Sequence, residues 1–229
     1  MAYNQAKSST DLTSFWYKNQ KTILTVVAII IIAILGVIAY KAFIQGPKED
    51  RANEQLSTVQ ATFQQAAFSP TLDTAAYKAV LNGNGKGGGA LGIIKSYSGT
   101  PAGNLAKYYA GAAYLHIGDF QSAVKYLKDF KTEQKQIQMM AYGALGDAYS
   151  ELKQNNAAID SYKKAASTFE DDAVNASEYL FRAGLLSELA GQKNDAITIY
   201  KKLKDEFPNT VKGTQAEKYL NRLELQPTN

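Results

Sequence analysis

The residues that most often perform chemistry are scarce in this chain. His116 is its single histidine and it has no cysteine, so a Cys-His arrangement is excluded and a Ser-His-acid arrangement would depend on this one imidazole. The usual thiolate and imidazole ligands of a zinc site are missing for the same reason. The adjacent acids Glu170, Asp171 and Asp172 lie in an expected turn, where a solvated charge run is the simpler interpretation. We therefore predict a protein that is not an enzyme and holds neither metal nor cofactor.

A glycine-rich segment could be mistaken for a nucleotide site. Gly83-x-Gly85-x-x-Gly88 has the spacing of a dinucleotide fingerprint. No strand is expected before it, and no Asp or Glu follows about 20 residues later, so the features that give this spacing its meaning are missing. A P-loop is also disfavoured, because Gly87 rather than Ser or Thr follows Lys86. We expect a flexible loop between two helices.

The charge distribution disfavours nucleic acid as a partner. The net charge is +4 over 229 residues, and the segment after residue 40 is nearly neutral, without the clustered Lys and Arg of a nucleic-acid footprint. One local asymmetry stands out, because no acidic residue occurs between Asp73 and Asp119. We interpret this basic segment as a solvated face, with a lipid or partner patch as the alternative. Its cations are Lys78, Lys86, Lys95 and Lys107.

One stretch near the N-terminus is apolar enough to cross a membrane. Thr22 to Tyr40 contain 19 residues without a charge. At the rise of an α-helix such a run spans roughly 28 Å, close to the ~30 Å hydrocarbon thickness of a bilayer. A signal peptide cut after Ala39 is the alternative, but the run exceeds the usual length of its apolar core. We predict a retained membrane span over residues 22–44, with the lipid bilayer contacted by Ile23, Val27, Ile31, Leu35 and Ile38.

Aromatic and basic residues flank this span. Phe15, Trp16 and Tyr17 precede it, and Tyr40 and Phe43 close it, as expected for aromatic belts at the two interfaces. The numbers of Lys and Arg on the two sides are equal. The short segment of residues 1–21 carries lysines directly before the span, and it need not be translocated. We therefore expect this tail to be cytoplasmic.

The segment after the span should connect it to a soluble domain. Gly46-Pro47 is expected to interrupt the helix, because proline lacks an amide donor and restricts the residue before it. Residues 49–67 then place Leu56, Val59 and Phe63 on one stripe of an amphipathic helix. We assign residues 45–70 to this linker and helix.

The remaining residues contain a repeat. Three segments, which begin at Ala110, Leu145 and Ala183, align without a gap at spacings of 35 and 38 residues. The shared positions are Gly111, Gly146 and Gly184, then Ala123, Ala158 and Ala196, then Leu127, Tyr162 and Tyr200. This pattern resembles the tetratricopeptide repeat (TPR), a pair of helices A and B with a period of about 34 residues. The resemblance implies an all-α solenoid over residues 71–229.

The ends of this solenoid follow the same pattern less closely. A degenerate fourth copy precedes the three clear ones and places Ala90, Ile94, Tyr97 and Pro101 in the positions of helix B. After Thr210, the sequence predicts a capping helix with Ala216, Tyr219, Leu220 and Leu223 turned inward. A solenoid needs such an end to cover its last apolar face.

TPR arrays bind partners along a surface lined by their A helices, so the resemblance also implies candidate contact residues. Counted by repeat position, the surface is mixed apolar and acidic. It lacks the Lys and Asn with which related arrays grip chaperone carboxylates. Buried packing is the alternative role for the apolar members. The candidates are Tyr108, Ala112, Leu115 and His116, then Gly143, Asp147, Ser150 and Glu151, then Phe181, Leu185, Glu188 and Leu189.

The whole architecture resembles one family. The segments "FWYKNQKTIL" and "IIKSYSGTPAGNLAKYYAGAAYLHIGDFQSAVKYL" are similar to those of the YfgM family of ancillary Sec-translocon subunits. This resemblance implies a single-pass protein of the bacterial inner membrane with its TPR domain in the periplasm. Its partners would be the Sec translocon subunits (SecYEG), a PpiD-like periplasmic chaperone and secreted client proteins. A TPR scaffold for envelope assembly or cell division, unrelated to secretion, is the alternative.

Overall fold

The computed structural model describes residues 2–69, 73–85 and 88–225, with side chains from Phe15 onward. Every regular element among these residues is a helix, which confirms the predicted all-α class. The chain divides into two compact units, Met1–Asp50 and Arg51–Asn229. The boundary falls inside the segment that we assigned to the linker and amphipathic helix.

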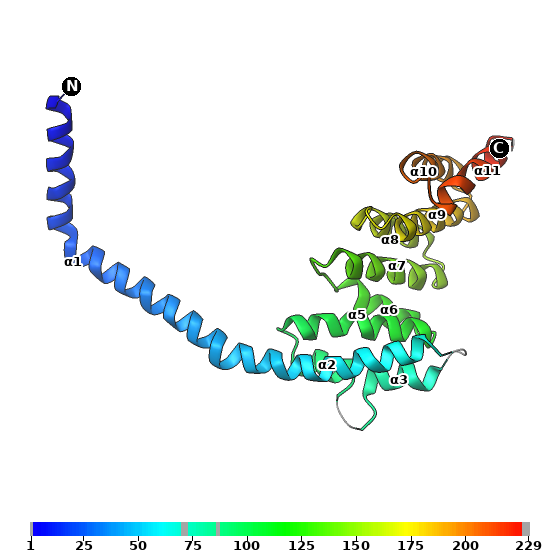
Figure 1. The fold of residues 1–229 in the computed structure, drawn as a ribbon, viewed down its shortest axis with the longest axis horizontal. Coiled ribbons are helices and arrows are strands. Elements are labelled where there is room, and N and C mark those ends of the chain that lie inside the picture. The colour runs from blue at the N-terminus through cyan, green and yellow to red at the C-terminus, as the bar shows by residue number, and fades with distance from the viewer. Residues whose placement is uncertain (1, 70–72, 86–87, 226–229) are drawn as a thin grey trace. The chain divides into compact units, whose positions relative to one another are not determined.

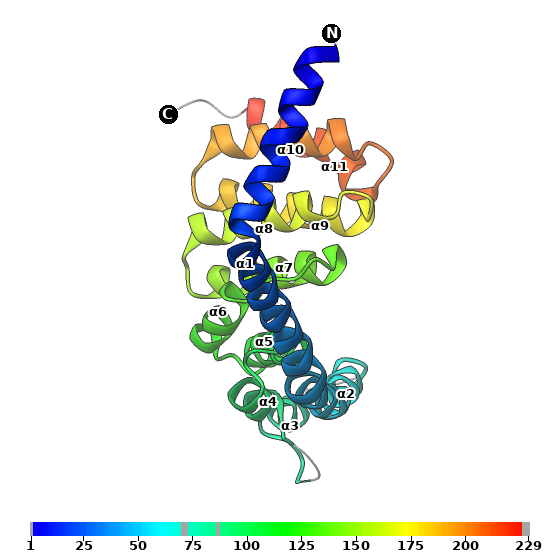
Figure 2. The ribbon, with the colours of Figure 1, turned by 90° about the vertical axis from the view of Figure 1, so that its left-hand side faces the viewer.

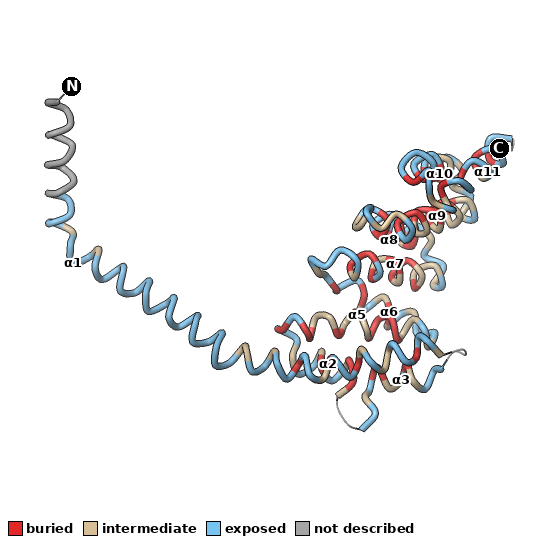
Figure 3. The backbone as a smooth tube through the Cα atoms, viewed as in Figure 1, coloured by how far each residue is buried: buried red, intermediate tan, exposed pale blue. Residues whose placement is uncertain are grey.

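The first unit is a long apolar helix. It consists of α1 (Ala2–Tyr40), the π-helix η1 (Lys41–Gln45) and the start of α2 (Gly46–Ala67). From Phe15 onward, Figure 3 shows this helix as almost entirely exposed. Of the residues expected to face lipid, Val27, Ile31, Leu35 and Ile38 are exposed and Ile23 is half-buried. The helical stretch from Phe15 to Ala67 is the one among the described residues that is long and apolar enough to cross a membrane.

The expected interruption at Gly46-Pro47 is wrong, because helical structure continues through this point. The amide of Gly46 donates a hydrogen bond to the carbonyl oxygen of Lys41, five residues earlier. The π-helix is followed directly by α2, which begins at Gly46. Pro47 therefore lies in the first turn of α2. A proline is tolerated in a first turn, where its missing N–H matters least.

The second unit is a stack of helix pairs. Its A helices are α3 (Thr74–Asn82), α5 (Pro101–His116), α7 (Lys135–Glu151), α9 (Ala173–Leu189) and α11 (Val211–Glu224). Its B helices are α4 (Ala90–Ser96), α6 (Phe120–Lys128), α8 (Asn155–Thr168) and α10 (Lys193–Glu206). Each helix packs against the next one along the chain, and the views in Figures 1 and 2 show the resulting stack. This is the predicted TPR solenoid, including its degenerate first pair.

The register of the repeats is visible in two sets of small residues. The four aligned alanines that begin the B helices, Ala90, Ala123, Ala158 and Ala196, are each 0% exposed. The A-helix glycines lie directly under residues of the following B helix. A Cβ on Gly146 would come within 2.6 Å of the Tyr162 ring, and one on Gly184 within 2.6 Å of the Tyr200 ring. Any side chain here would force the paired helices apart.

Both ends of the solenoid are closed by amphipathic helices. At the front, α2 buries Ala52, Leu56 and Val59 against the first helices of the stack, and Phe63 is half-buried. At the back, α11 buries Ala216, Leu220 and Leu223, as expected of the capping helix. Apolar surface that would otherwise face water at each end is therefore covered.

Two of the turns between helices are built alike. The Thr100 hydroxyl accepts a hydrogen bond of 3.0 Å from the Gly103 amide at the start of α5. Thr210 accepts the equivalent bond of 3.0 Å from Gly213 at the start of α11. Each threonine hydroxyl also donates to a carbonyl three residues earlier, at 2.8 Å for Thr100 and 2.9 Å for Thr210. Threonine N-caps of this kind fix where a helix begins.

Candidate functional site

The candidate contact residues lie on α5, α7 and α9, but they differ in how much surface they offer. Tyr108, Ala112 and Phe181 are only 7%, 6% and 5% exposed. The Tyr108 ring packs on Phe130, and Phe181 packs on Tyr200 and Tyr219. These three side chains therefore hold neighbouring helices together and leave almost no surface for a partner. Gly143 is buried as well, beneath the ring of Tyr179.

His116 belongs to an aromatic cluster at the front of the solenoid. Its ring stacks on Tyr77 with centroids 4.3 Å apart, and it forms an edge-to-face pair with Phe63 with centroids 6.1 Å apart. Because Phe63 belongs to α2, this helix covers the A-helix surface of the solenoid at the N-terminal end of the stack. Burial lowers the pKa of His116, and the negative charge of Asp147 opposes this shift only in part. His116 is therefore expected to be neutral at physiological pH.

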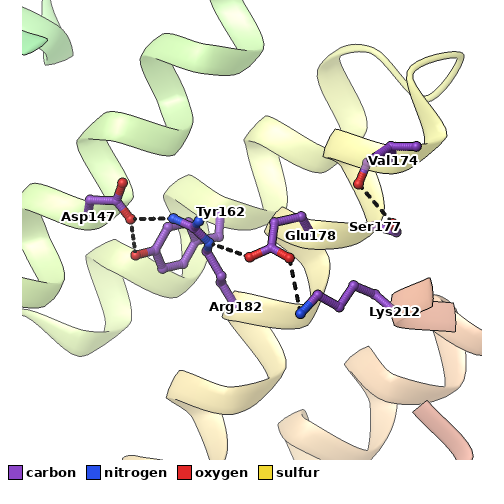
Figure 4. A network of polar contacts seen from close by, with 7 residues as sticks. All are labelled: Asp147, Tyr162, Val174, Ser177, Glu178, Arg182 and Lys212. Atoms are coloured by element: carbon purple, nitrogen blue, oxygen red, sulfur yellow. Dashed lines mark hydrogen bonds and ion pairs between the residues drawn. The ribbon is translucent and has the colours of Figure 1, made fainter. Parts of the chain in front are cut away.

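Asp147 is held by two other helices (Figure 4). The Tyr162 hydroxyl of α8 donates a hydrogen bond of 2.8 Å to its Oδ1 atom, and Arg182 Nη1 of α9 lies 3.0 Å from the same oxygen. The buried hydroxyl of Tyr162 has a raised pKa, caused by desolvation and then by the nearby Asp147 charge. One carboxylate thus joins the A and B helices of its own repeat to the A helix of the next.

The same network continues to the capping helix. Arg182 Nε donates to Glu178 Oε1 at 2.9 Å, and Lys212 Nζ of α11 lies 3.3 Å from Glu178 Oε2. Burial alone would raise the pKa of Glu178, but the bonds from Arg182 and Lys212 outweigh it and lower the pKa. The charges on this part of the surface are therefore paired within the domain.

Glu188 repeats the arrangement one repeat later. Arg222 Nη2 contacts its Oε1 at 2.6 Å and its Oε2 at 2.7 Å, and the Tyr200 hydroxyl lies 3.4 Å from Oε2. Asp147 and Glu188, two of the three acids of the candidate surface, are thus each bound by a B-helix tyrosine and by an arginine of the next A helix. Sequence reasoning missed Arg182 and Arg222. A usable signal existed, because each arginine follows its acid by about one repeat, 35 and 34 residues respectively.

The surface that remains accessible is smaller and more apolar than the candidate set. His116 is exposed, but one face of its ring is covered by Tyr77. Away from this aromatic cluster, Glu151 and Leu189 are exposed, and Leu189 reaches 84%. Leu115, Ser150 and Leu185 are half-buried. We define Leu115, Ser150, Glu151, Leu185 and Leu189 as the open A-helix surface. Its character suits weak apolar contacts rather than the capture of a charged group.

The described residues offer little else to bind a small ligand. Among them, no group of three or more His, Cys, Asp or Glu side chains could hold a metal ion. A groove with a volume of about 430 Å³ lies between the B helices α8 and α10. Its apolar lining residues are Ile159, Leu180 and Ile199.

Comparison with protein families identifies the repeat type. Residues 141–172 and residues 178–210 each match a family described as tetratricopeptide repeat. These two segments are tetratricopeptide repeats. They cover most of the pairs α7–α8 and α9–α10, whose packing is the one described above. No curated protein and no solved structure matches the chain significantly. TPR domains mediate contacts between proteins, and the chain joins such a scaffold to an apolar N-terminal helix.

Proposed function

We propose that this chain is a non-catalytic TPR scaffold anchored in the bacterial inner membrane, where it acts as an ancillary subunit of the Sec translocon. The observation that carries the proposal is the apolar stretch from Thr22 to Tyr40, whose described side chains are almost all exposed. So much apolar surface is stable in lipid and costly in water. In this proposal residues 1–21 form the cytoplasmic tail, residues 22–44 span the membrane, and the TPR domain is periplasmic.

The anchor would act by raising local concentration. A domain tethered beside the channel meets emerging chains at an effective concentration in the mM range, so weak contacts suffice. The open A-helix surface, with Leu185 and Leu189 among its members, has the apolar character that unfolded secreted proteins require. SecYEG and a PpiD-like chaperone would be the fixed partners, as the resemblance to the YfgM family implies.

A purification in mild detergent tests the proposal. The chain would carry a C-terminal tag, and bound proteins would be identified by mass spectrometry. We expect SecYEG subunits and a PpiD-like chaperone to be retained. A matched control replaces residues 22–44 by an unrelated span of equal length, which keeps the anchor but changes the helix face that a channel could recognise.

The outcomes separate the two candidate functions. Retention of SecYEG by the natural chain and its loss in the span exchange would support a translocon subunit. Enrichment of division or envelope-assembly proteins by both versions, without Sec subunits, would contradict the translocon role. The TPR domain would then be a scaffold that needs only some anchor.

A further inference from the structure

Positive charge is distributed unevenly between the two kinds of helix in the TPR domain. The B helices α4, α6, α8 and α10 together contain nine lysines and four acidic residues. The A helices α3, α5, α7, α9 and α11 contain seven basic and six acidic residues. The excess positive charge of the domain therefore lies on its B helices, away from the open A-helix surface.

Several of these lysines share one repeat position. In each B helix a lysine lies five positions after the buried alanine of the repeat pattern. An additional lysine, Lys164, extends the series on α8. All of them are exposed. We call this series the lysine row, and its members are Lys95, Lys128, Lys163, Lys164 and Lys201.

The lysines of this row form no ion pairs with the described residues of the domain. None of its members lies within 4.0 Å of a carboxylate of any described residue, whereas Lys202 and Lys204, also on α10, pair with Glu206 and Glu217. The arginines of the TPR domain behave differently, since Arg182 and Arg222 are both bound to carboxylates of the A helices. Among the described residues, the lysine row thus consists of unpaired lysines that recur at one position of the B helices, whereas the unpaired lysines of the A helices, such as Lys107 and Lys135, share no repeat position.

The chemistry of lysine indicates the kind of partner. Arginine recognises fixed, planar carboxylates, whereas lysine is a mobile point charge that needs no defined geometry. A surface of mobile anionic headgroups fits a row of such charges better than a protein with carboxylates in fixed places. Each lysine near an anionic bilayer strengthens binding about five-fold. The predicted span keeps a bilayer permanently within reach.

We propose that the lysine row docks the B-helix face of the TPR domain onto anionic phospholipids of the membrane that anchors the chain. This inference rests on the membrane anchoring proposed above. Docking through the B helices would leave the open A-helix surface turned toward partners. It extends the basic segment noted in the sequence, of which Lys95 is a member.

The full chain reconstituted in lipid nanodiscs provides the test. Because the chain has no cysteine, a single Ser167→Cys substitution on the exposed surface of α8 can carry a fluorescent donor. Energy transfer to an acceptor on lipid headgroups is compared between discs of phosphatidylcholine and discs of an equimolar mixture with phosphatidylglycerol. A second label at Gln136→Cys on the A helix α7 reports the other face. We expect transfer from the α8 label to rise in anionic discs and to fall again in about 0.5 M salt.

Two variants with the same change in net charge complete the design. Replacing all five members of the lysine row by Gln should reduce the transfer in anionic discs to its value in neutral discs. Replacing five lysines outside the B helices should leave the difference intact; these are Lys78, Lys107, Lys135, Lys153 and Lys218. Circular dichroism verifies that both variants fold, and the salt dependence of the unmutated chain gives a result that does not depend on any variant.

The failures of docking and of anchoring are distinguishable. Equal transfer in neutral and anionic discs, from a chain that co-purifies with both, would overturn docking and leave the anchor intact. An equal loss in the two variants would also overturn it, because the position of the charges would then not matter. A chain that enters neither kind of disc would contradict the anchoring, and docking with it.

Discussion

The hydroxyl of Tyr162 and the nitrogen Nη1 of Arg182 meet at one oxygen of Asp147, at 2.8 and 3.0 Å. The tyrosine comes from the B helix of the same repeat and the arginine from the A helix of the next. Packing in a solenoid is mostly local, so such polar links between successive repeats add directional contacts to the apolar interfaces. They also remove Asp147 from the set of charges that a partner could bind.

Removing the Tyr162 hydroxyl should weaken this link without disturbing the packing. In Tyr162→Phe the ring still covers Gly146, but Asp147 loses one hydrogen bond. We expect the free energy of unfolding to fall by about 1 kcal/mol, measured by urea denaturation followed by circular dichroism. Tyr126→Phe is the control, because its hydroxyl makes no hydrogen bond to a described residue. Equal stability of the two variants would show that the link contributes nothing.

The contact between Gly146 and Tyr162 predicts a larger effect. A methyl group on Gly146 would lie 2.6 Å from the Tyr162 ring, so Gly146→Ala must push α7 and α8 apart. We expect a loss of about 1–3 kcal/mol in the same denaturation experiment. Gly92→Ala on α4 is the matched control, since nothing lies within 4 Å of the added methyl group. There the change should stabilise the helix by about 0.5–1 kcal/mol, and a loss at both sites would contradict the packing argument.

A charge in the middle of the apolar helix tests the anchor. Leu35→Lys should cost roughly 2.5–3.5 kcal/mol of insertion free energy. We expect a measurable shift of the protein from the membrane fraction to the soluble fraction, quantified by immunoblotting after centrifugation. Leu189→Lys, on the open A-helix surface, introduces the same charge and should leave the fractionation unchanged. An unchanged distribution of Leu35→Lys would refute the predicted span.

The stacked His116 predicts a specific pH dependence of stability. Burial holds its pKa below the ordinary value of 6.5, so the unfolded chain takes up a proton more readily than the folded one. The stability linked to this group is complete above about pH 6.5 and decreases as the pH falls below it. His116→Gln should therefore lose less stability than the natural chain between about pH 7 and about pH 5. If the free energy of unfolding fell by the same amount in both proteins between these pH values, His116 would not have this role.

The repeats could be predicted from sequence because their register depends on residue size at a few positions. Gly146, Ala158 and Tyr162 recur as Gly184, Ala196 and Tyr200, and the structure packs both sets in the same way. The capping helix was predictable for a related reason, since Leu220 and Leu223 continue the apolar stripe. Size and period are properties that a sequence displays directly.

The errors arose where a residue's role depends on a neighbour elsewhere in the chain. Proline rules assume an α-helix, so they could not anticipate that a π-turn at Lys41–Gln45 would carry the helix past Pro47. Repeat position alone could not reveal that Tyr108 and Phe181 face other helices. Nor could it show that Asp147 is already paired with Arg182. The candidate contact residues lie on the A helices α5, α7 and α9, but only the structure separates the packing residues among them from the accessible ones.

The matching turns at Thr100 and Thr210 show that α11 begins like an A helix, on the same turn as α5. In α11 the polar Asn221 stands where the A helices of the clear repeats have glycine. A helix packed on α11 at this point could therefore not approach it as closely as α6 approaches Gly111. Asn221→Gly would be the first step in building a further helix pair onto α11 by design.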